Sequence, residues 1–242
     1  MLSIKNISWT APNGNKIINN LSLDIADGTL TVITGPNGGG KTTLAKIIAG
    51  IEIPQEGEIL LDGEDITKLD VTERAKRGIS FAFQQPVRFK GVTVRKLLEL
   101  AAGGEIDEKR ICVILGEVGL CAREYIDREV NSTLSGGEIK RIEIATVIAR
   151  HTKLTIFDEP EAGIDLWSFT NLIKIFDEMR EKRQGTMVVI SHQERILKTA
   201  DNIAVVANGS IKNSGSAEII LPTLLGGYEM AKKCSTQEKM FK

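Results

Sequence analysis

The sequence predicts an α/β fold in which a mainly parallel sheet is flanked by helices. An apolar, β-branched run, Thr29–Ile33, is followed by a glycine-rich stretch and then by a helical pattern over Thr43–Ala49. Two further apolar runs, Leu154–Phe157 and Thr186–Ser191, also end directly before polar side chains. Apolar runs that alternate with helical patterns are typical of a parallel sheet. At 242 residues, the chain is long enough for one large domain with a lobe inserted into it.

A small antiparallel sheet is expected before the glycine-rich stretch. Apolar and polar residues alternate over Leu2–Ser8 and again over Leu21–Ile25, and the turn-forming segment Pro12–Asn15 lies between these runs. After the first helix, Gly57–Gly63 has a strand pattern closed by an Asp-Gly turn, which is typical of a hairpin. Trp9 is placed either to stack on a purine base or to cover the small sheet, and the sequence leaves both roles open.

The glycine-rich stretch matches the phosphate-binding template G-x-x-x-x-G-K-[ST] from Gly35 to Thr42. Glycine lets the backbone turn sharply and direct successive N–H groups at an anion. Lys41 adds a positive charge for the outer phosphates, Thr42 offers a hydroxyl to Mg²⁺, and the helix that follows directs its N-terminus at the same phosphates. The residues expected to bind the nucleotide here are Gly35, Asn37, Gly38, Gly39, Gly40, Lys41, Thr42 and Thr43.

Polar side chains also follow other predicted strands. Asp158 and Glu159 come directly after one buried strand, and ligands bind at the carboxyl ends of strands in an open parallel sheet. Asp158 suits a metal ion, and Glu159 suits a water molecule beside the γ-phosphate. His192 ends the next strand and is expected to contact the γ-phosphate. Gln84 follows a shorter strand, and Pro86 ends that strand because proline cannot continue a ladder.

A helical lobe is expected in the middle of the chain. Apolar residues recur at i, i+3 and i+4 over residues 94–128. Ser135 and Glu138 then form a capping-box pattern at the start of a further helix, Ile139–Ala149. We assign residues 86–149 to this helical subdomain and residues 1–85 and 150–225 to the core.

The last third of the chain predicts another helix and a hairpin. Asp165 is expected to cap a long amphipathic helix that runs to Arg183. Asn208-Gly209 marks the turn of a hairpin, and a short helix follows to Leu225. Residues 226–242 form a lysine-rich tail with little apolar periodicity, which is expected to be mobile or to order only on a partner.

Composition excludes several classes of protein. The 31 Lys and Arg residues are balanced by 32 Asp and Glu residues, so the chain has no excess of positive charge for nucleic acid. No apolar run approaches the ~18 residues that a membrane helix needs, and strand-like sequence stands where a signal peptide would begin. We therefore expect a cytoplasmic protein without membrane insertion. The three cysteines form no C-x-x-C pair, so Cys112 and Cys121 are expected in the core and Cys234 in the tail.

The order of these motifs resembles that of ATP-binding-cassette (ABC) proteins. The resemblance extends from residue 1 to about residue 216 and implies a P-loop NTPase core with an antiparallel β subdomain and an inserted helical subdomain. Gly35–Thr42 resembles the Walker A loop, Gln84 the glutamine loop, Leu134–Glu138 the signature motif, Leu154–Glu159 the Walker B strand with its glutamate, Ala162–Asp165 the D-loop, and His192 the switch histidine.

The resemblance implies a mechanism that one chain cannot complete. Two copies would face head to tail, so that each ATP is bound by the phosphate loop of one copy and the signature motif of the other. One departure is that the position of the usual adenine-stacking aromatic falls on Ala11. The residues implied on the signature side are Ser135, Gly136, Gly137 and Asp165. The implied catalytic residues are Glu159, His192 and Gln84, and the implied Mg²⁺ ligands are Thr42, Asp158 and Gln84.

Three segments are similar to the ATPase subunit of the Suf iron–sulfur cluster assembly system, namely Phe81–Val87, Ser135–Ile144 and Ser191–Leu197. Two features depart from it: Pro160 is typical of transporter cassettes, and the helical insert is short. The resemblance therefore implies an ATPase that drives conformational change in one or more soluble Suf-type scaffold proteins. The alternatives are the nucleotide-binding subunit of an ABC membrane transporter and an ATPase without a stable partner.

Overall fold

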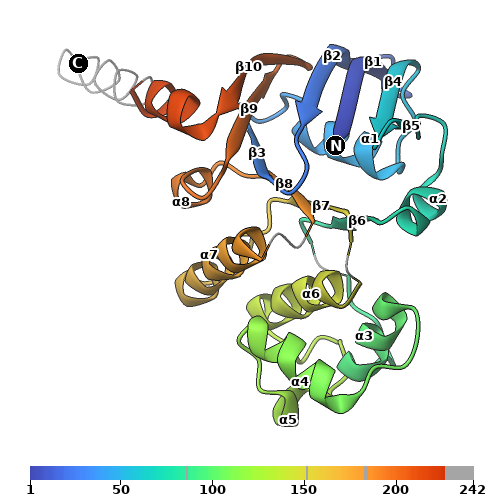
Figure 1. The fold of residues 1–242 in the computed structure, drawn as a ribbon, viewed down its shortest axis with the longest axis vertical. Coiled ribbons are helices and arrows are strands. Elements are labelled where there is room, and N and C mark those ends of the chain that lie inside the picture. The colour runs from blue at the N-terminus through green and yellow to red at the C-terminus, as the bar shows by residue number, and fades with distance from the viewer. Residues whose placement is uncertain (86, 151, 183–184, 227–242) are drawn as a thin grey trace.

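The computed structural model describes residues 1–85, 87–150, 152–182 and 185–226, and these ranges contain two sheets and a separate group of helices (Figure 1). The four-stranded antiparallel sheet has the order β2-β1-β4-β5, and the six-stranded sheet has the order β10-β9-β3-β8-β7-β6. The α/β fold class and the antiparallel β subdomain that the sequence predicts are confirmed. Pro86, Arg183 and the expected tail beyond residue 226 lie outside the described residues.

The strands of the antiparallel sheet are β1 (Leu2–Thr10), β2 (Lys16–Ile25), β4 (Glu56–Leu61) and β5 (Glu64–Asp65). Those of the second sheet are β3 (Leu30–Thr34), β6 (Ile79–Ala82), β7 (Leu154–Asp158), β8 (Thr186–Ile190), β9 (Asn202–Ala207) and β10 (Ser210–Ser216). The helices are α1 (Lys41–Ala49), α2 (Val71–Lys76), α3 (Val94–Ala102), α4 (Glu108–Glu117), α5 (Ala122–Tyr125), α6 (Gly136–Arg150), α7 (Leu166–Glu181) and α8 (Glu194–Leu197), and residues 217–226 are also helical.

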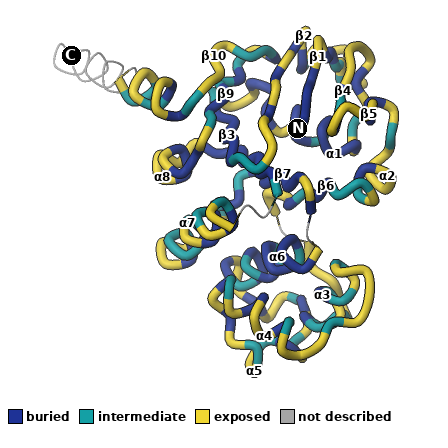
Figure 2. Tube along the Cα trace, in the orientation of Figure 1, coloured by how far each residue is buried: buried dark blue, intermediate teal, exposed yellow. Residues whose placement is uncertain are grey.

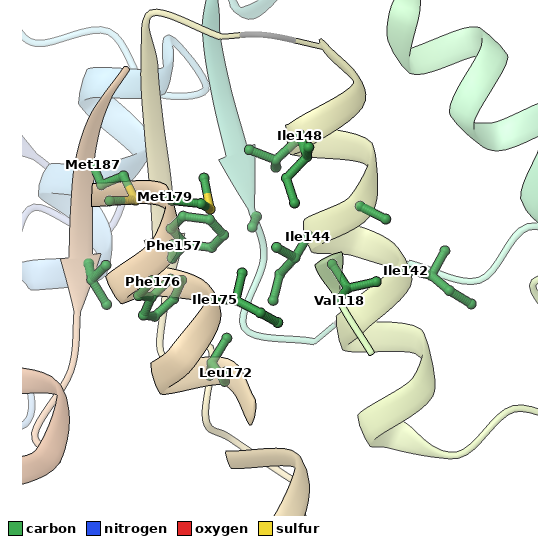
Figure 3. Packing of buried hydrophobic residues seen from close by; sticks show 14 of the residues in the cluster. Val118, Ile142, Ile144, Ile148, Phe157, Leu172, Ile175, Phe176, Met179 and Met187 are labelled. Carbon is green, nitrogen blue, oxygen red and sulfur yellow. The ribbon is translucent and has the colours of Figure 1, made fainter. Parts of the chain in front are cut away.

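The middle strands of the second sheet are buried on both faces, as their continuous apolar runs predict. Successive residues of a strand point to opposite faces. Ile156 of β7 therefore joins a core cluster shared with α1 and the antiparallel sheet, whereas Phe157 joins a second cluster. In Figure 3, Phe157 lies beside Phe176 and Met179 of α7. This packing fixes β7, and with it the carboxylates that follow the strand.

Helices α3 to α6 gather in a lobe below the sheets (Figure 1). Most residues of α6 are buried (Figure 2), and the side chains of Ile144 and Ile148 reach toward the sheet (Figure 3). One apolar cluster thus spans the lobe, α7 and one face of the second sheet. The division of the chain at residues 86 and 149 stays a prediction.

The expectation that Cys112 and Cys121 lie in the core is wrong, because both side chains are exposed. Ile111, Ile114 and Leu115 occupy the buried face of α4, which leaves Cys112 on the outer face. Cys121 precedes α5 as its N-cap residue. Cys234 lies outside the described residues.

Helix α2 is absent from the sequence expectations. It begins with a complete capping box between Asp70 and Glu73, and this four-residue pattern is the signal that could have predicted it. Trp9 is half-buried and packs on the cluster beneath the antiparallel sheet, so it covers that sheet as one of its two expected roles requires.

Candidate nucleotide-binding and hydrolysis site

Four parallel strands deliver the predicted site residues to one edge of the second sheet. β3, β8, β7 and β6 are consecutive neighbours in the sheet and are all parallel. Their carboxyl ends therefore meet at the same edge, where ligands of open parallel sheets bind. The glycine-rich loop follows β3, His192 follows β8, Glu159 follows β7 and Gln84 follows β6. These segments are far apart in the sequence and close together in the fold.

The loop between β3 and α1 is seated against the end of β9. A Cβ atom on Gly35 would lie 2.0 Å from the carbonyl oxygen of Val206, and one on Gly39 would lie 2.8 Å from the same oxygen. Gly35 also has a φ of 133°, which side chains rarely allow. Glycine is therefore required at Gly35 both by its neighbour and by its backbone.

Helix α1 begins without a side-chain cap. Its N-cap residue is Gly40, and its first turn contains no acidic residue, whereas α2, α3, α4 and α7 each have a capping side chain. The first N–H groups of a helix need partners, and they carry the positive end of the helix dipole. An uncapped N-terminus that follows a glycine loop is suited to bind phosphate.

Lys41 is 6% exposed and lies against this loop. Its Nζ donates to the carbonyl oxygens of Gly35 and Pro36, at 2.9 Å in each case. Burial lowers the pKa of Lys41, and the nearby carboxylates of Glu159 and Asp158 oppose that shift. Among the described residues, the acceptors of the ammonium group are these two neutral carbonyl groups, and a phosphate oxygen would form a stronger, charge-assisted hydrogen bond.

Thr42 and Asp158 provide two adjacent oxygen atoms. Thr42 Oγ1 lies 3.2 Å from Asp158 Oδ1, and the Asp158 side chain is buried. Burial raises the pKa of Asp158, the Thr42 hydrogen bond lowers it, and the charge of Glu159 raises it further. Mg²⁺ prefers oxygen ligands and is usually held by one or two protein groups together with substrate phosphates and water. The pair therefore fits Mg²⁺, and a cation here would relieve the charge repulsion on Asp158.

Glu159 is the point at which the other strand ends converge. Its carboxylate accepts a hydrogen bond from Gln84 Nε2 at 2.5 Å and lies 3.9 Å from His192 Nε2. The residue has a φ of 44°, a backbone conformation that is uncommon for residues other than glycine. Its N–H donates to the Ile190 carbonyl oxygen at 3.0 Å. Burial and the charge of Lys41 lower the pKa of His192, and Glu159 opposes them. The structure thus joins the three predicted catalytic residues.

The signature motif opens α6 as the sequence predicts. Ser135 and Glu138 form the expected capping box, with Ser135 N–H donating to Glu138 at 2.6 Å and Glu138 N–H to Ser135 Oγ at 3.2 Å. Although burial raises the pKa of Glu138, hydrogen bonds from Tyr125 and Ser135 lower it to about 2. A Cβ on Gly137 would meet Ser168 Oγ at 2.5 Å, so the signature glycines pack directly against the start of α7.

Asp165 caps α7 rather than reaching outward. Its carboxylate accepts hydrogen bonds from Trp167 N–H at 2.9 Å, Ser168 N–H at 3.0 Å and Ser168 Oγ at 2.8 Å. Among the described residues, no hydrogen bond or ion pair joins Ser135, Gly136 or Gly137 to the phosphate loop. In Figure 1, α6 and α1 lie in different parts of the molecule. One copy of the chain therefore does not bring the two predicted halves of the site together.

Sequence reasoning missed one acidic residue of the site. Glu161 lies two positions after Glu159 and accepts a hydrogen bond from Ser191 Oγ at 2.5 Å, and Ser191 Oγ in turn accepts from Gln193 N–H at 3.0 Å. Burial raises the pKa of Glu161. Glu161 thus ties the segment after β7 to the segment that carries His192. The third acid in the run Asp158–Glu161 is the signal that could have indicated it.

We compared the chain with known proteins, since its site combines a phosphate loop, the carboxylate of Glu159 and the Thr42–Asp158 oxygen pair with a separate signature helix. The sequence model of the family described as ABC transporter matches residues 18–162, which is more than half of the chain. The chain belongs to the ABC transporter family. As an ABC cassette it binds ATP, and it is an ATPase.

Individual relatives agree with the family. An uncharacterized ABC transporter ATP-binding protein of Methanocaldococcus jannaschii is 39% identical to this ABC ATPase, over 84% of each chain. A probable ATP-dependent transporter of Trieres chinensis is 32% identical over 96% of this chain and 98% of its own. A solved structure, described as the dimeric post-hydrolysis state of an ATP-binding cassette bound to ADP and Pi, superposes with a TM-score of 0.81. It is 25% identical and covers 90% of this chain and 99% of the other.

Proposed function

We propose that this ABC ATPase is the nucleotide-binding subunit of a membrane transporter and hydrolyses ATP in the cytoplasm, at the interface of a head-to-tail dimer. The separation of the signature motif from the phosphate loop supports the dimer, because each copy offers two incomplete halves of a site. The related cassette that was solved as a dimer supports it too. The relatives named as transporters favour a membrane partner.

Different residues of the site would have different roles in hydrolysis. The phosphate loop, Lys41 and the N-terminus of α1 would bind the phosphates, and Ser135, Gly136 and Gly137 of a second copy would close over the γ-phosphate. Glu159 would orient and deprotonate the attacking water, since it lies within reach of both Gln84 and His192. Thr42, Asp158 and Gln84 would hold Mg²⁺, which neutralises charge on the phosphates when bound.

An apolar groove beside Gln84 carries the proposal of a membrane partner. The groove has a volume of 320 Å³ and opens between β6 and the helical lobe. Its apolar lining includes Phe83, Val87, Phe89 and Leu100, all of them exposed side chains. Exposed apolar side chains that line one groove are suited to an amphipathic helix. Among the helices of the described ranges, none is long and apolar enough to cross a bilayer.

Iron–sulfur cluster assembly is the second candidate function. The segments Phe81–Val87 and Ser135–Ile144 favour it, and residues of both segments line the groove. A soluble Suf-type scaffold would then occupy the groove in place of a membrane subunit. The relatives above carry transporter names, so this role stays a prediction.

Affinity purification of the tagged chain from detergent-solubilised cells of its source tests the proposal. We expect a polytopic membrane protein to co-purify, and Phe83→Asp or Leu100→Asp in the groove to remove it. Val113→Asp is the matched control, because the exposure of Val113 lies between those of Phe83 and Leu100 but Val113 is not part of the groove lining. Recovery of a soluble iron–sulfur scaffold protein would instead establish the second candidate.

A further inference from the structure

Two charged residues of α6 pack against the segment that carries Gln84, the first buried and the second, Glu143, 17% exposed. Lys140 is 2% exposed, and its Nζ donates to the Phe83 carbonyl oxygen at 2.6 Å. Glu143 accepts a hydrogen bond from the Phe83 N–H at 3.0 Å, and its other carboxylate oxygen lies 2.8 Å from Lys140 Nζ. One pair of side chains therefore holds both polar backbone groups of Phe83.

The gain in folding stability from this ion pair does not explain its presence. Burial raises the pKa of Glu143, and the Lys140 ammonium and the Phe83 N–H oppose that shift. A buried ion pair contributes little net stability, because desolvation of both charges offsets their attraction. An apolar pair of similar volume would fill the same space at no lower stability. What such a pair would lack is the directional contact with the backbone of Phe83.

Phe83, the residue that this pair holds, is next to the proposed hydrolysis site. Gln84 follows Phe83 directly, and its side chain donates to Glu159 at 2.5 Å. Lys140 lines the hollow that also contains Gln84, Gly136 and Gly163, whereas Glu143 lines the apolar groove on the other side. The pair thus belongs to the signature helix and lies between the groove and Gln84, the residue that contacts Glu159.

We propose that Lys140 and Glu143 are positioning residues for hydrolysis. They fix the backbone of Phe83 to α6, so that the Gln84 side chain is kept at Glu159. The inference rests on the proposed roles of Gln84 and Glu159. It also links the groove to the site. An occupant of the groove would contact Glu143 and would shift Gln84 through the bond from Glu143 to the Phe83 backbone.

The double variant Lys140→Met/Glu143→Leu tests this role, because it removes both charges and leaves no buried charge without a partner. We expect its midpoint of thermal unfolding to equal or exceed that of the wild type, while kcat falls about tenfold, as for outer-shell partners of metal ligands. KM for ATP should change less than twofold, since the phosphate loop is untouched. The Mg²⁺ concentration at half-maximal rate should rise, and the Phe83 amide should exchange its hydrogen faster.

Two further variants make the result unambiguous. Lys96→Met/Glu99→Leu removes an ion pair with the same i,i+3 spacing from α3 and should leave kcat, the Mg²⁺ requirement and amide exchange unchanged. Gln84→Ala should itself lower kcat, and if it does not, the proposed role of Gln84 is wrong. If Gln84→Ala lowers kcat but the folded Lys140→Met/Glu143→Leu variant matches the α3 control, the positioning role is overturned. Should the double variant not fold, the same comparison of kcat is made with Lys140→Met, in which the Phe83 carbonyl oxygen loses its donor and the remaining charge, on Glu143, is 17% exposed.

Discussion

Gln84 Nε2 donates a hydrogen bond to Glu159 across 2.5 Å, although the two residues are 75 positions apart in the chain. β6 and β7 are neighbouring parallel strands, and each residue follows the carboxyl end of its strand. The bond connects the segment beside the apolar groove to the carboxylate that is proposed to activate water.

Glu159→Gln should abolish most hydrolysis but preserve ATP binding. An amide cannot accept the proton of the attacking water, so we expect the rate to fall at least about 100-fold. ATP would then remain bound and hold two copies together. Light scattering of the variant with saturating ATP should report a dimer. A variant that stays monomeric under these conditions, or that hydrolyses ATP at the normal rate, would contradict the proposed role of Glu159.

Removal of divalent cations should stop hydrolysis, and Asp158→Asn should raise the Mg²⁺ requirement. The Thr42 and Asp158 oxygens are 3.2 Å apart, and the variant exchanges a charged oxygen ligand for a neutral amide. We expect the Mg²⁺ concentration at half-maximal rate to rise about tenfold or more. Asp177→Asn, which removes a carboxylate that pairs with Arg180 on α7, is the control and should leave that concentration unchanged.

Arg74→Ala should destabilise the whole core. Arg74 is fully buried, and its guanidinium donates to the carbonyl oxygens of Ile47 and Ile48 at the end of α1 and to those of Thr67 and Leu69. Burial lowers its pKa to about 10, so it is still charged at neutral pH. Leaving these buried acceptors unpaired should lower the free energy of unfolding by about 3 kcal/mol, measured by urea denaturation.

Two further substitutions serve as comparisons for the loss of unfolding free energy in Arg74→Ala. Arg74→Lys should recover only part of the loss, because an ammonium group cannot reproduce the fork of donors that reaches four carbonyl groups. Arg77→Ala removes a partly exposed ion pair with Glu64 in the same segment and should cost less than about 1 kcal/mol. Equal effects of Arg74→Ala and Arg77→Ala would mean that the buried contacts contribute nothing.

Glu161→Gln should stabilise the protein at neutral pH and lose that effect in acid. Burial raises the pKa of Glu161 above its ordinary value of 4.5, so the folded protein binds its proton more tightly than the unfolded chain does. The ionised carboxylate is therefore unfavourable in the folded state, and glutamine avoids this cost while still accepting from Ser191. The gain in the free energy of unfolding should be full above the folded pKa and vanish below 4.5.

Denaturation curves of the wild type and Glu161→Gln between pH 4 and pH 8 check this dependence. Glu105→Gln, at an exposed position of the helical lobe, is the control and should show no comparable trend with pH. A stability difference between Glu161→Gln and the wild type that is the same at every pH would contradict the buried-carboxylate explanation.

Local sequence was enough to predict the elements of the nucleotide site. The template from Gly35 to Thr42 is contiguous, and its strand and helix lie on either side of it, so no distant contact is needed to interpret it. The same holds for Asp158 at the end of a buried apolar run and for the capping box that begins at Ser135. Cys112 shows the limit of such reasoning, because small apolar character does not decide which face of α4 is buried.

The sequence by itself determined the α/β fold, the phosphate loop and the set of strand-end residues, because each depends on short-range periodicity or on residues adjacent in the chain. Only the tertiary structure decided which of these residues meet. The order of β3, β8, β7 and β6 brings Gln84 and His192 to Glu159. The packing of α6 against the segment after β6 also brings Lys140 and Glu143 to Phe83, a contact between residues about sixty positions apart that no local pattern encodes.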